Sequence, residues 1–231
     1  MLNANRTRLP RRSRSAFLDC LPDAQRKLLA ALGREVSFAA GENLVTEGSP
    51  APPVFIVHSG FVKVLRAAQS DSVPMIVDLC GAGDVIGVED CLTERRSHAA
   101  LVAAKSLVVL EIPQRAFRAY LADHPRAMAT VAQILASRVR LRDMTLSFAA
   151  HKVGSRLTAF LARQQAIHGH RHKDSIVIDI GLNHADIAAA IGASAASVSS
   201  ELVKLKNDGY IEIGYKTIHV KKQLRDDAPP V

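Results

Sequence analysis

The sequence predicts an α+β protein with a β-rich N-terminal half, a long central helix and a C-terminal winged helix-turn-helix. Three observations support this: short glycine-punctuated β-rich runs between 34 and 112, an uninterrupted helical stretch at about 126–148, and two amphipathic helices joined at a glycine within 183–209. Many short strands with glycine turns indicate a β-sandwich or barrel. The expected divisions are a disordered basic tail, the β-rich domain, a dimerisation helix, the winged domain and a polar tail, at residues 1–15, 16–125, 126–148, 149–221 and 222–231.

The β-rich domain is expected to open with one helix at 16–33, whose leucines and phenylalanine recur at helical spacing. Ser59 and Gly60 separate two β-rich runs, and this short connection predicts a hairpin turn. A second helix is expected to end before Pro125, because proline disfavours helical geometry in the residue that precedes it. The clearest strands are the apolar runs at 54–58, 61–65, 73–79 and 106–112.

The apolar residues of the long helix recur at spacings of three, seven and seven, which is a sparse heptad pattern. The pattern consists of Val131, Ile134, Leu141 and Phe148, with interruptions at Arg138 and Thr145. It predicts a dimer coiled coil, and the alternative is a helix that packs on the β-rich domain.

The helix pair at 183–209 is defined by capping residues as well as by periodicity. Asn183 and Ser194 are expected N-caps, Gly192 forms the turn and Gly209 suits a left-handed stop. The apolar faces comprise Ile187 and Ile191 in the first helix and Val198, Leu202 and Leu205 in the second. A glycine-turned helix pair of this kind enters the DNA major groove.

The segments around the pair complete a winged helix-turn-helix. A helix is expected at 152–167, a polar loop at 168–174, a strand at 175–182 and a hairpin at 210–220 that turns near 214–216. His168, His170 and His172 alternate in the loop, where an exposed turn is the favoured interpretation and a metal site the alternative.

The composition favours an acidic partner, either nucleic acid or an anionic surface. The formal net charge is +8 and the pI is about 9.7, and five arginines precede the first acidic residue, Asp19. We expect a cytoplasmic protein without a membrane partner, since there is no secretory signal and no apolar run of the ~18 residues that span a bilayer. Cys20, Cys80 and Cys91 are widely spaced, which predicts buried, inert thiols and no metal site. No catalytic motif is present, so the chain is not predicted to be an enzyme.

In this order, the motifs resemble those of the cyclic-AMP receptor protein/FNR (Crp/Fnr) superfamily of bacterial transcription regulators. The resemblance covers about 16–220 and is carried by VFIVHSGFVKV, GAGDVIG, ALVAAKS–VVLEIP, the long helix and DIAAAIGASAASVSSELVKLKNDGYIEIGYKTIHV. It implies an effector-binding β-roll (jelly roll), a dimerisation helix and a DNA-binding winged helix.

The expected effector pocket departs from the family's cyclic-AMP motif. Val88 stands at the family's glutamate position with Glu89 next to it, and His98 and Ala99 stand where an Arg-Ser pair holds the cyclic phosphate. A buried anionic ligand requires a cation and backbone donors, so the usual cyclic-AMP binding is not expected unless a shifted loop delivers Arg96 and Ser97. The predicted pocket set is Gly87, Val88, Glu89, Arg96, Ser97, His98, Ala99 and Arg142. Arg138, Arg140, Arg142 and Asp143 either face solvent or meet a different anionic effector. An iron–sulfur cluster is disfavoured because no N-terminal cysteine group exists, whereas His58, His98 and His124 leave a haem interpretation open.

The second helix of the pair opens with alanine and serine, which predicts modest direct base readout and greater dependence on DNA shape and phosphate contacts. The predicted DNA-binding residues are Ala195, Ala196, Ser197, Ser199, Ser200, Lys204, Lys152, Arg156 and Lys216, with Lys206, Tyr215 and Thr217 as further candidates.

The leading functional hypothesis is a homodimeric transcription regulator that binds double-stranded DNA, contacts RNA polymerase and is controlled by a small effector in the roll. Two-fold DNA sites favour two-fold proteins. The alternatives are a ligand-independent regulator of the same fold and a cyclic-nucleotide-responsive partner of an enzyme.

Overall fold

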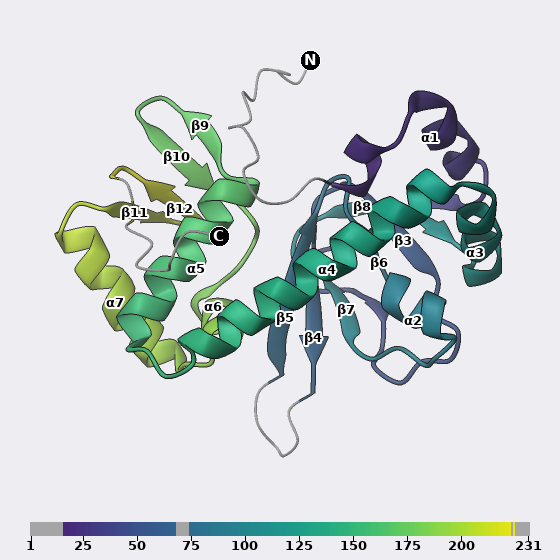
Figure 1. The fold of residues 1–231 in the computed structure, drawn as a ribbon. Coiled ribbons are helices and arrows are strands. Elements are labelled where there is room, and N and C mark those ends of the chain that lie inside the picture. Colours follow the sequence, from purple (N-terminus) through teal and green to yellow (C-terminus); the bar gives the residue numbers. More distant parts are fainter. Residues whose placement is uncertain (1–15, 68–73, 223, 225–231) are drawn as a thin grey trace. The chain divides into compact units, whose positions relative to one another are not determined.

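The computed structural model describes residues 16–67, 74–222 and 224 (Figure 1). The predicted tail at 1–15 and most of the tail at 222–231 lie outside the described residues. The chain forms two compact units whose boundary falls between Asp143 and Met144, inside the long helix α4 (Pro125–Phe148). Each unit is described separately.

Two four-stranded antiparallel sheets form the roll of the first unit. One sheet has the order β1 (Arg34–Phe38), β8 (Leu107–Ile112), β3 (Val54–Ser59) and β6 (Val85–Ile86). The other has the order β2 (Asn43–Val45), β7 (Ala100–Ala103), β4 (Phe61–Arg66) and β5 (Met75–Gly81). All four predicted strands are confirmed, and the short strands β1, β2, β6 and β7 are added to them.

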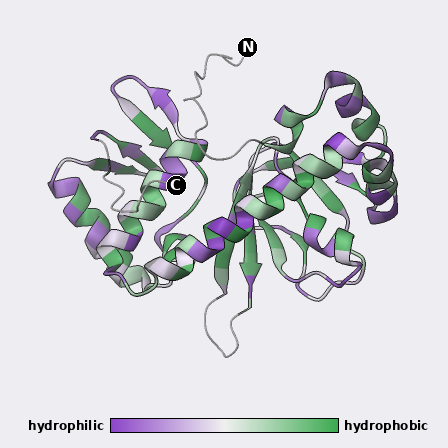
Figure 2. Cartoon of the chain, in the orientation of Figure 1, coloured by the Kyte–Doolittle hydropathy of each residue, from purple (hydrophilic) through white to green (hydrophobic). Residues whose placement is uncertain are grey.

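Strand β3 is apolar along most of its length because it is covered on both faces. Val54 and Ile56 belong to a core shared with the helices of this unit, whereas Phe55 and Val57 belong to the core between the two sheets. Successive side chains of a strand point to opposite faces, so a strand buried on both sides needs a continuous apolar run. Figure 2 shows this concentration of hydrophobic residues in the strands of the roll.

The predicted hairpin turn at Ser59–Gly60 is wrong, because β3 and β4 lie in different sheets. The chain crosses between the sheets at Gly60, whose φ is +86°. A Cβ atom at this position would lie 2.3 Å from the carbonyl oxygen of Ser106. Glycine is therefore needed for both its positive φ and the close backbone approach, not for a two-residue hairpin.

The single helix predicted at 16–33 is also wrong. The structure has a 3₁₀ turn, η1 (Phe17–Cys20), and a separate helix α1 (Asp23–Ala30). Leu21 is extended and Pro22 is the N-cap of α1, because proline disfavours helical geometry in the preceding residue and suits a helix start. Helix α3 (Gln114–Asp123) matches the second prediction, and a short helix, α2 (Val88–Thr93), was not predicted.

Two faces of α4 carry apolar residues, and the predicted seam begins on the buried one. Val131 is 1% exposed in the core of the roll unit, and Ile134 packs against the same core. Val131 is therefore not available to a second helix and Ile134 is only partly so, which corrects the start of the predicted seam. The side chain of Phe148 lies outside the described part of the chain. Met128, Val139 and Leu146 are the large exposed hydrophobic residues of α4.

The second unit is a winged helix-turn-helix, as predicted. Its elements are α5 (Val153–His168), β9 (His170–His172), β10 (Ser175–Ile178), α6 (His184–Ile191), α7 (Ala195–Asn207), β11 (Ile211–Gly214) and β12 (Thr217–Val220). The sheet order is β11-β12-β10-β9. Part of the predicted loop at 168–174 forms β9, which pairs with β10, so this loop prediction was too long.

Candidate DNA interface and effector pocket

Local hydrogen bonds define both ends of the helix pair. Asn183 accepts from the backbone N–H of Asp186 at 2.8 Å, and Asp186 accepts from that of Asn183 at 3.1 Å, which completes a capping box. Ser194 accepts from the backbone N–H of Ser197 at 3.1 Å and caps α7. Gly192 ends α6 with a φ of 63°, a left-handed geometry that favours glycine. The predicted caps are confirmed.

Helix α7 buries one face and exposes another. Val198 and Leu202 are fully buried, so the helix is held on the domain by its inner face. On the outer face Ala195, Ala196, Ser200 and Lys204 are exposed. Val203, at 51% exposed, belongs to this surface and was not predicted. Val203 lies three residues after Ser200, and this helical spacing could have placed it on the exposed face from the sequence.

The three serines expected to face bases have different surroundings. Ser197 shares a hydroxyl hydrogen bond of 2.9 Å with Ser194. Ser199 is half-buried and lies 2.8 Å from Nδ1 of His184 on α6. Ser200 is exposed and has no side-chain hydrogen bond within the described chain. Ser200 is thus the serine with the greatest freedom to meet a base.

Arg156 has a structural task that sequence reasoning missed. Its Nη1 donates to the carbonyl oxygens of Ile191 at 2.7 Å and Gly192 at 3.0 Å, so it satisfies the carboxyl end of α6 at the turn of the helix pair. Lys152, the N-cap of α5, is exposed. A Cβ on Gly154 would approach Glu201 within 2.8 Å, which places the start of α5 beside α7.

The wing ends in an exposed basic turn between β11 and β12. Tyr215 is 89% exposed, and Lys216 has a φ of 53° at the turn. The ammonium of Lys216 lies 5.8 Å from the centre of the Tyr215 ring. On α7, Lys204 forms an exposed ion pair of 2.7 Å with Glu201, an interaction that is weak in water and easily exchanged for a phosphate.

A small cavity of about 20 Å³ in the roll includes most of the predicted effector residues. This volume holds about one water molecule. The predicted residues that line it are Gly87, Glu89, Ser97, His98, Ala99 and Arg142. The structure adds the lining residues Pro52, Pro53, Val64, Asp78, Ile86, Asp90, Leu101 and Arg138.

Two predicted pocket residues lie elsewhere. Val88 is 1% exposed and packs in the core beneath the helices. Arg96 is exposed and donates to the carbonyl oxygen of Gly48 at 3.0 Å. Ser97 does reach the cavity, but its hydroxyl donates to the carbonyl oxygen of Ala99 at 2.7 Å. The suggested shifted loop therefore does not bring Arg96 to the cavity.

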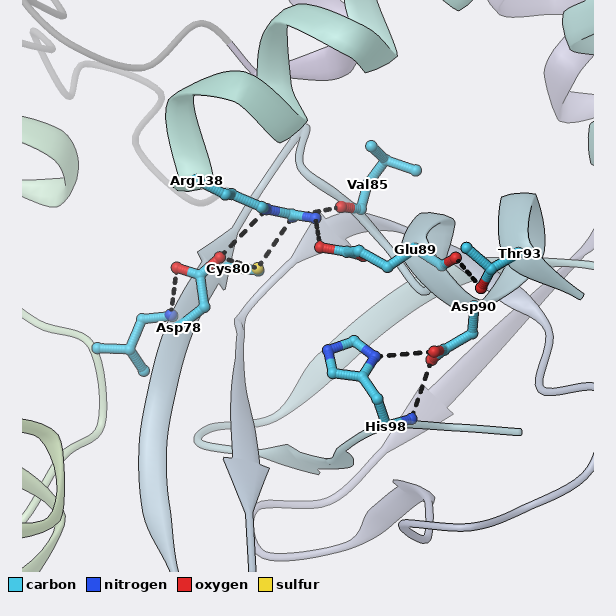
Figure 3. A network of polar contacts seen from close by, with 9 residues as sticks. Asp78, Cys80, Val85, Glu89, Asp90, Thr93, His98 and Arg138 are labelled. Carbon is cyan, nitrogen blue, oxygen red and sulfur yellow. Dashed lines mark hydrogen bonds and ion pairs between the residues drawn. The ribbon is translucent and has the colours of Figure 1, made fainter. Parts of the chain in front are cut away.

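Arg138 is the central charge of the pocket and was not in the predicted set. It is 8% exposed and reaches from α4 to β5, β6 and α2 (Figure 3). Its Nε lies 3.3 Å from Oδ2 of Asp78, its Nη1 donates to Oε1 of Glu89 at 2.9 Å, and its Nη2 donates to the carbonyl oxygen of Val85 at 2.8 Å. We call Arg138, Asp78, Glu89 and Val85 the Arg138 network.

The electrostatics of the network favour an ionised Glu89. Burial alone would raise the pKa of Glu89, but the guanidinium of Arg138, hydrogen bonds and His98 hold the pKa below its ordinary value of 4.5. His98 lies 2.8 Å from Oδ1 of Asp90 through its Nδ1, and its backbone N–H also donates to Asp90. At the position where the family's cyclic-AMP motif has Arg-Ser, this chain thus has a histidine that pairs with Asp90.

The cysteines and histidines do not assemble into a metal centre. No group of three or more His, Cys, Asp or Glu residues suited to a metal occurs within 16–67, 74–222 and 224. Burial raises the pKa of Cys91 to about 11, and Cys80 is also buried, whereas Cys20 is exposed, contrary to the prediction. His58 pairs with Glu35 at 3.2 Å, and His124 stacks on Tyr120. Across the described chain, no helix is both long and apolar enough to span a bilayer.

A cyclic nucleotide does not fit this pocket as it stands. The cavity is far smaller than the 300–1,000 Å³ of typical ligand sites. Among its lining residues, the three carboxylates of Asp78, Glu89 and Asp90 outnumber the guanidinium groups of Arg138 and Arg142. An anionic ligand would therefore meet a site whose buried cation is already neutralised.

Comparison with known proteins agrees with both units. Two family models match, that of the cyclic nucleotide-binding domain at 35–124 and that of the Crp-like helix-turn-helix domain at 155–226. The chain is 32% identical to the global nitrogen regulator of Synechococcus elongatus over 188 residues, which cover 79% of this chain and 83% of that protein. It is 23% identical to the CRP-like cAMP-activated global transcriptional regulator of Mycobacterium tuberculosis, over 85% and 89% of the two chains.

Solved structures show the same fold. The c-di-GMP responsive global regulator CLP of Xanthomonas campestris matches with a TM-score of 0.74 at 18% identity, over 87% of this chain and all of that one. FixK2 of Bradyrhizobium japonicum matches with a TM-score of 0.73 at 20% identity, over 86% and 99%. With its two-sheet roll, its long helix and its winged helix pair, the chain belongs to the Crp/Fnr superfamily and is a DNA-binding transcription regulator of that type.

Proposed function

We propose that the chain acts as a cytoplasmic, sequence-specific homodimeric regulator that inserts α7 into the DNA major groove and acts on RNA polymerase. The observation that supports this most is the outer face of α7, where exposed small side chains lie over the buried anchors Val198 and Leu202. Small side chains allow close approach to base edges, while Lys152, Lys204 and Lys216 supply phosphate contacts. No enzymatic activity is part of the proposal.

The second half of the proposal is a dimer formed by the exposed stripe of α4. The stripe follows the four-three spacing of coiled-coil core positions and consists of Met128, Ala132, Leu135, Val139, Arg142 and Leu146. Leu135 is half-buried and also packs against the roll core, whereas the other five residues are exposed. Met128, Val139 and Leu146 are 38%, 55% and 72% exposed. A second copy of the same stripe would cover these residues in a two-fold interface. The stripe is shifted by one residue toward the C-terminus from the heptad seam that was predicted from the sequence.

Two experiments test this function. Selection of duplexes from a random DNA library should enrich two related half-sites about one helical turn, roughly 10 bp, apart. Sedimentation equilibrium should show a dimer. Val139→Asp should weaken this dimer, because two carboxylates would face each other between the two stripes. Ser137→Asp, on the exposed side of α4 away from the stripe, should leave the dimer unchanged. A wild-type chain that enriches no duplex contradicts the DNA-binding proposal, and a monomeric wild-type chain contradicts the dimer.

The regulation of this dimer has two candidate forms. The small cavity and the neutralised Arg138 support binding to DNA without a ligand. Control by a small effector is supported by Arg142, which lines the rim of the cavity, is exposed and has no ion pair within the described chain. Titration of the selected duplex with and without cyclic AMP and cyclic GMP separates the two for these nucleotides. A tenfold gain in affinity would support the effector.

A further inference from the structure

The Arg138 network joins one helix to three other elements of the roll unit. The guanidinium comes from α4, the carboxylate of Asp78 from β5, that of Glu89 from α2, and the carbonyl group of Val85 from β6 (Figure 3). All three nitrogens of the guanidinium have an oxygen within 3.3 Å. A buried cation is tolerated only with such counter-charges and hydrogen bonds.

The network supplies the contacts that a bound anion would make. A phosphate or carboxylate ligand would pair with the guanidinium through two oxygens, in the bidentate manner that arginine favours. Here Asp78 and Glu89 provide those oxygens, and Nη2 donates to the carbonyl oxygen of Val85 and to Sγ of Cys80. The cavity of about 20 Å³ leaves no room for a ligand beside them.

The network also acts on the helix that leads to the DNA-binding unit. Arg138 is five residues before the unit boundary, and α4 continues without a break to Phe148. Fixing Arg138 on the roll therefore constrains the direction in which α4 leaves it.

We propose that Asp78 and Glu89 are built-in substitutes for an anionic effector, so that the chain attains its DNA-binding form without a ligand. This rests on the proposed DNA-binding function and selects one of its two forms of regulation. The mechanism is a population shift that the chain's own carboxylates achieve, because they favour the conformation with α4 fixed on the roll.

The test removes one carboxylate and asks whether an external anion restores what was lost. Glu89→Ala exposes the guanidinium and opens space beside it. Loss of a charge-assisted hydrogen bond predicts a fall of about tenfold or more in affinity for the selected duplex. Inorganic phosphate or cyclic AMP at millimolar concentration should restore most of this affinity, and neither should improve the wild-type chain.

Three further variants identify the cause of the loss. Glu94→Ala removes an exposed glutamate just after α2 and should leave DNA affinity unchanged, since Glu94 pairs with Arg118 and not with Arg138. Arg138→Met should lose affinity that neither anion restores, because the cation is gone, whereas Arg140→Met, an exposed position on the same helix, should behave as wild type. Circular dichroism and thermal unfolding check that each variant is folded. If Arg138→Met does not fold, Glu89→Ala decides alone.

Three outcomes would overturn the proposal. They are a tenfold gain of wild-type DNA affinity with cyclic AMP, unchanged DNA affinity of Glu89→Ala, and a loss in Glu89→Ala that neither anion restores. Calorimetry separates this proposal from the proposed function. If the wild-type chain selects no DNA, the substitute role still predicts that Glu89→Ala binds phosphate or cyclic AMP and that the wild-type chain binds neither, and the opposite result rejects it.

Discussion

Polar side chains have opposite environments in the roll pocket and on the outer face of α7. In the pocket, Arg138 is 8% exposed, its Nη1 and Nη2 donate to Glu89 and Val85, and it forms an ion pair with Asp78. On α7, Ser200 is exposed and has no side-chain partner within the described chain. Buried polar groups must be paired inside the protein, whereas exposed ones exchange water for a partner at little cost. In the proposed function, the pocket is therefore a closed site and the outer face of α7 is an open surface for DNA.

The largest expected effect comes from a charge on the open surface. Ser200→Glu should lower DNA affinity by at least about 100-fold, because a carboxylate in the groove repels the phosphates and like charges at an interface cost several kcal/mol. A gel-shift titration with the selected duplex measures this loss. Ser137→Glu, an equivalent change on the exposed outer side of α4, is the control and should bind as wild type. Unchanged affinity of Ser200→Glu would mean that another face of the unit meets DNA.

The second prediction concerns the pocket and the pH dependence of the free energy of unfolding. Glu89→Gln should lower the free energy of unfolding by about 1–2 kcal/mol at neutral pH, because a neutral amide replaces the charged partner of Arg138. The folded-state pKa of Glu89 lies below its ordinary value of 4.5, so its carboxylate stabilises the fold above that pH. This contribution is lost as the pH falls through the folded-state pKa.

Urea unfolding on both sides of pH 4.5 measures this difference. The gap between the wild-type chain and Glu89→Gln should close in acid, while Glu94→Gln should show no comparable gap at any pH. A gap that is constant with pH would show that Glu89 acts through packing and not through its charge.

The third effect concerns the place where the pocket and the dimer stripe meet. Arg142 lines the cavity rim and also occupies a core position of the stripe. A charge at such a position lowers the stability of a coiled coil, so Arg142→Leu should tighten the dimer by about tenfold. Sedimentation equilibrium measures the change, with Arg140→Leu, outside the stripe, as the control. A weaker dimer would mean that Arg142 forms a favourable contact across the interface.

The sequence predicted the features that depend on local chemistry. The caps at Asn183 and Ser194 and the turn at Gly192 follow from residues within one helical turn of each other, and all three were confirmed. The fold class and four strands of the roll followed from apolar periodicity. Pro22, which separates η1 from α1, was a local signal that was not used when a single helix was predicted at 16–33.

The features that depend on tertiary contacts were not predictable in this way. Residues 78, 85, 89 and 138 are brought together only by the packing of α2 and α4 on strands β5 and β6. From the sequence, Arg138 was one of several charges that either face solvent or meet an anionic effector. The hairpin prediction at Gly60 was wrong because a glycine between two strands is the same local signal for a hairpin and for a crossing between two sheets. The predicted seam on α4 began on the buried face because the helix carries two apolar faces, and periodicity alone does not say which one the roll covers.

The smallest effect tests how far the open surface extends beyond α7. Lys216 lies at the tip of the exposed wing, and a single phosphate contact there predicts that Lys216→Ala weakens DNA binding only a few-fold. Because each phosphate contact releases counterions, the slope of log K against log salt should become shallower by about 0.9. Fluorescence anisotropy over a salt series measures both quantities, and Lys63→Ala, on β4 of the roll, serves as the control. An unchanged slope would restrict the DNA surface to α7 and the start of α5, while a steep wild-type slope would still identify phosphate contacts as the main source of affinity.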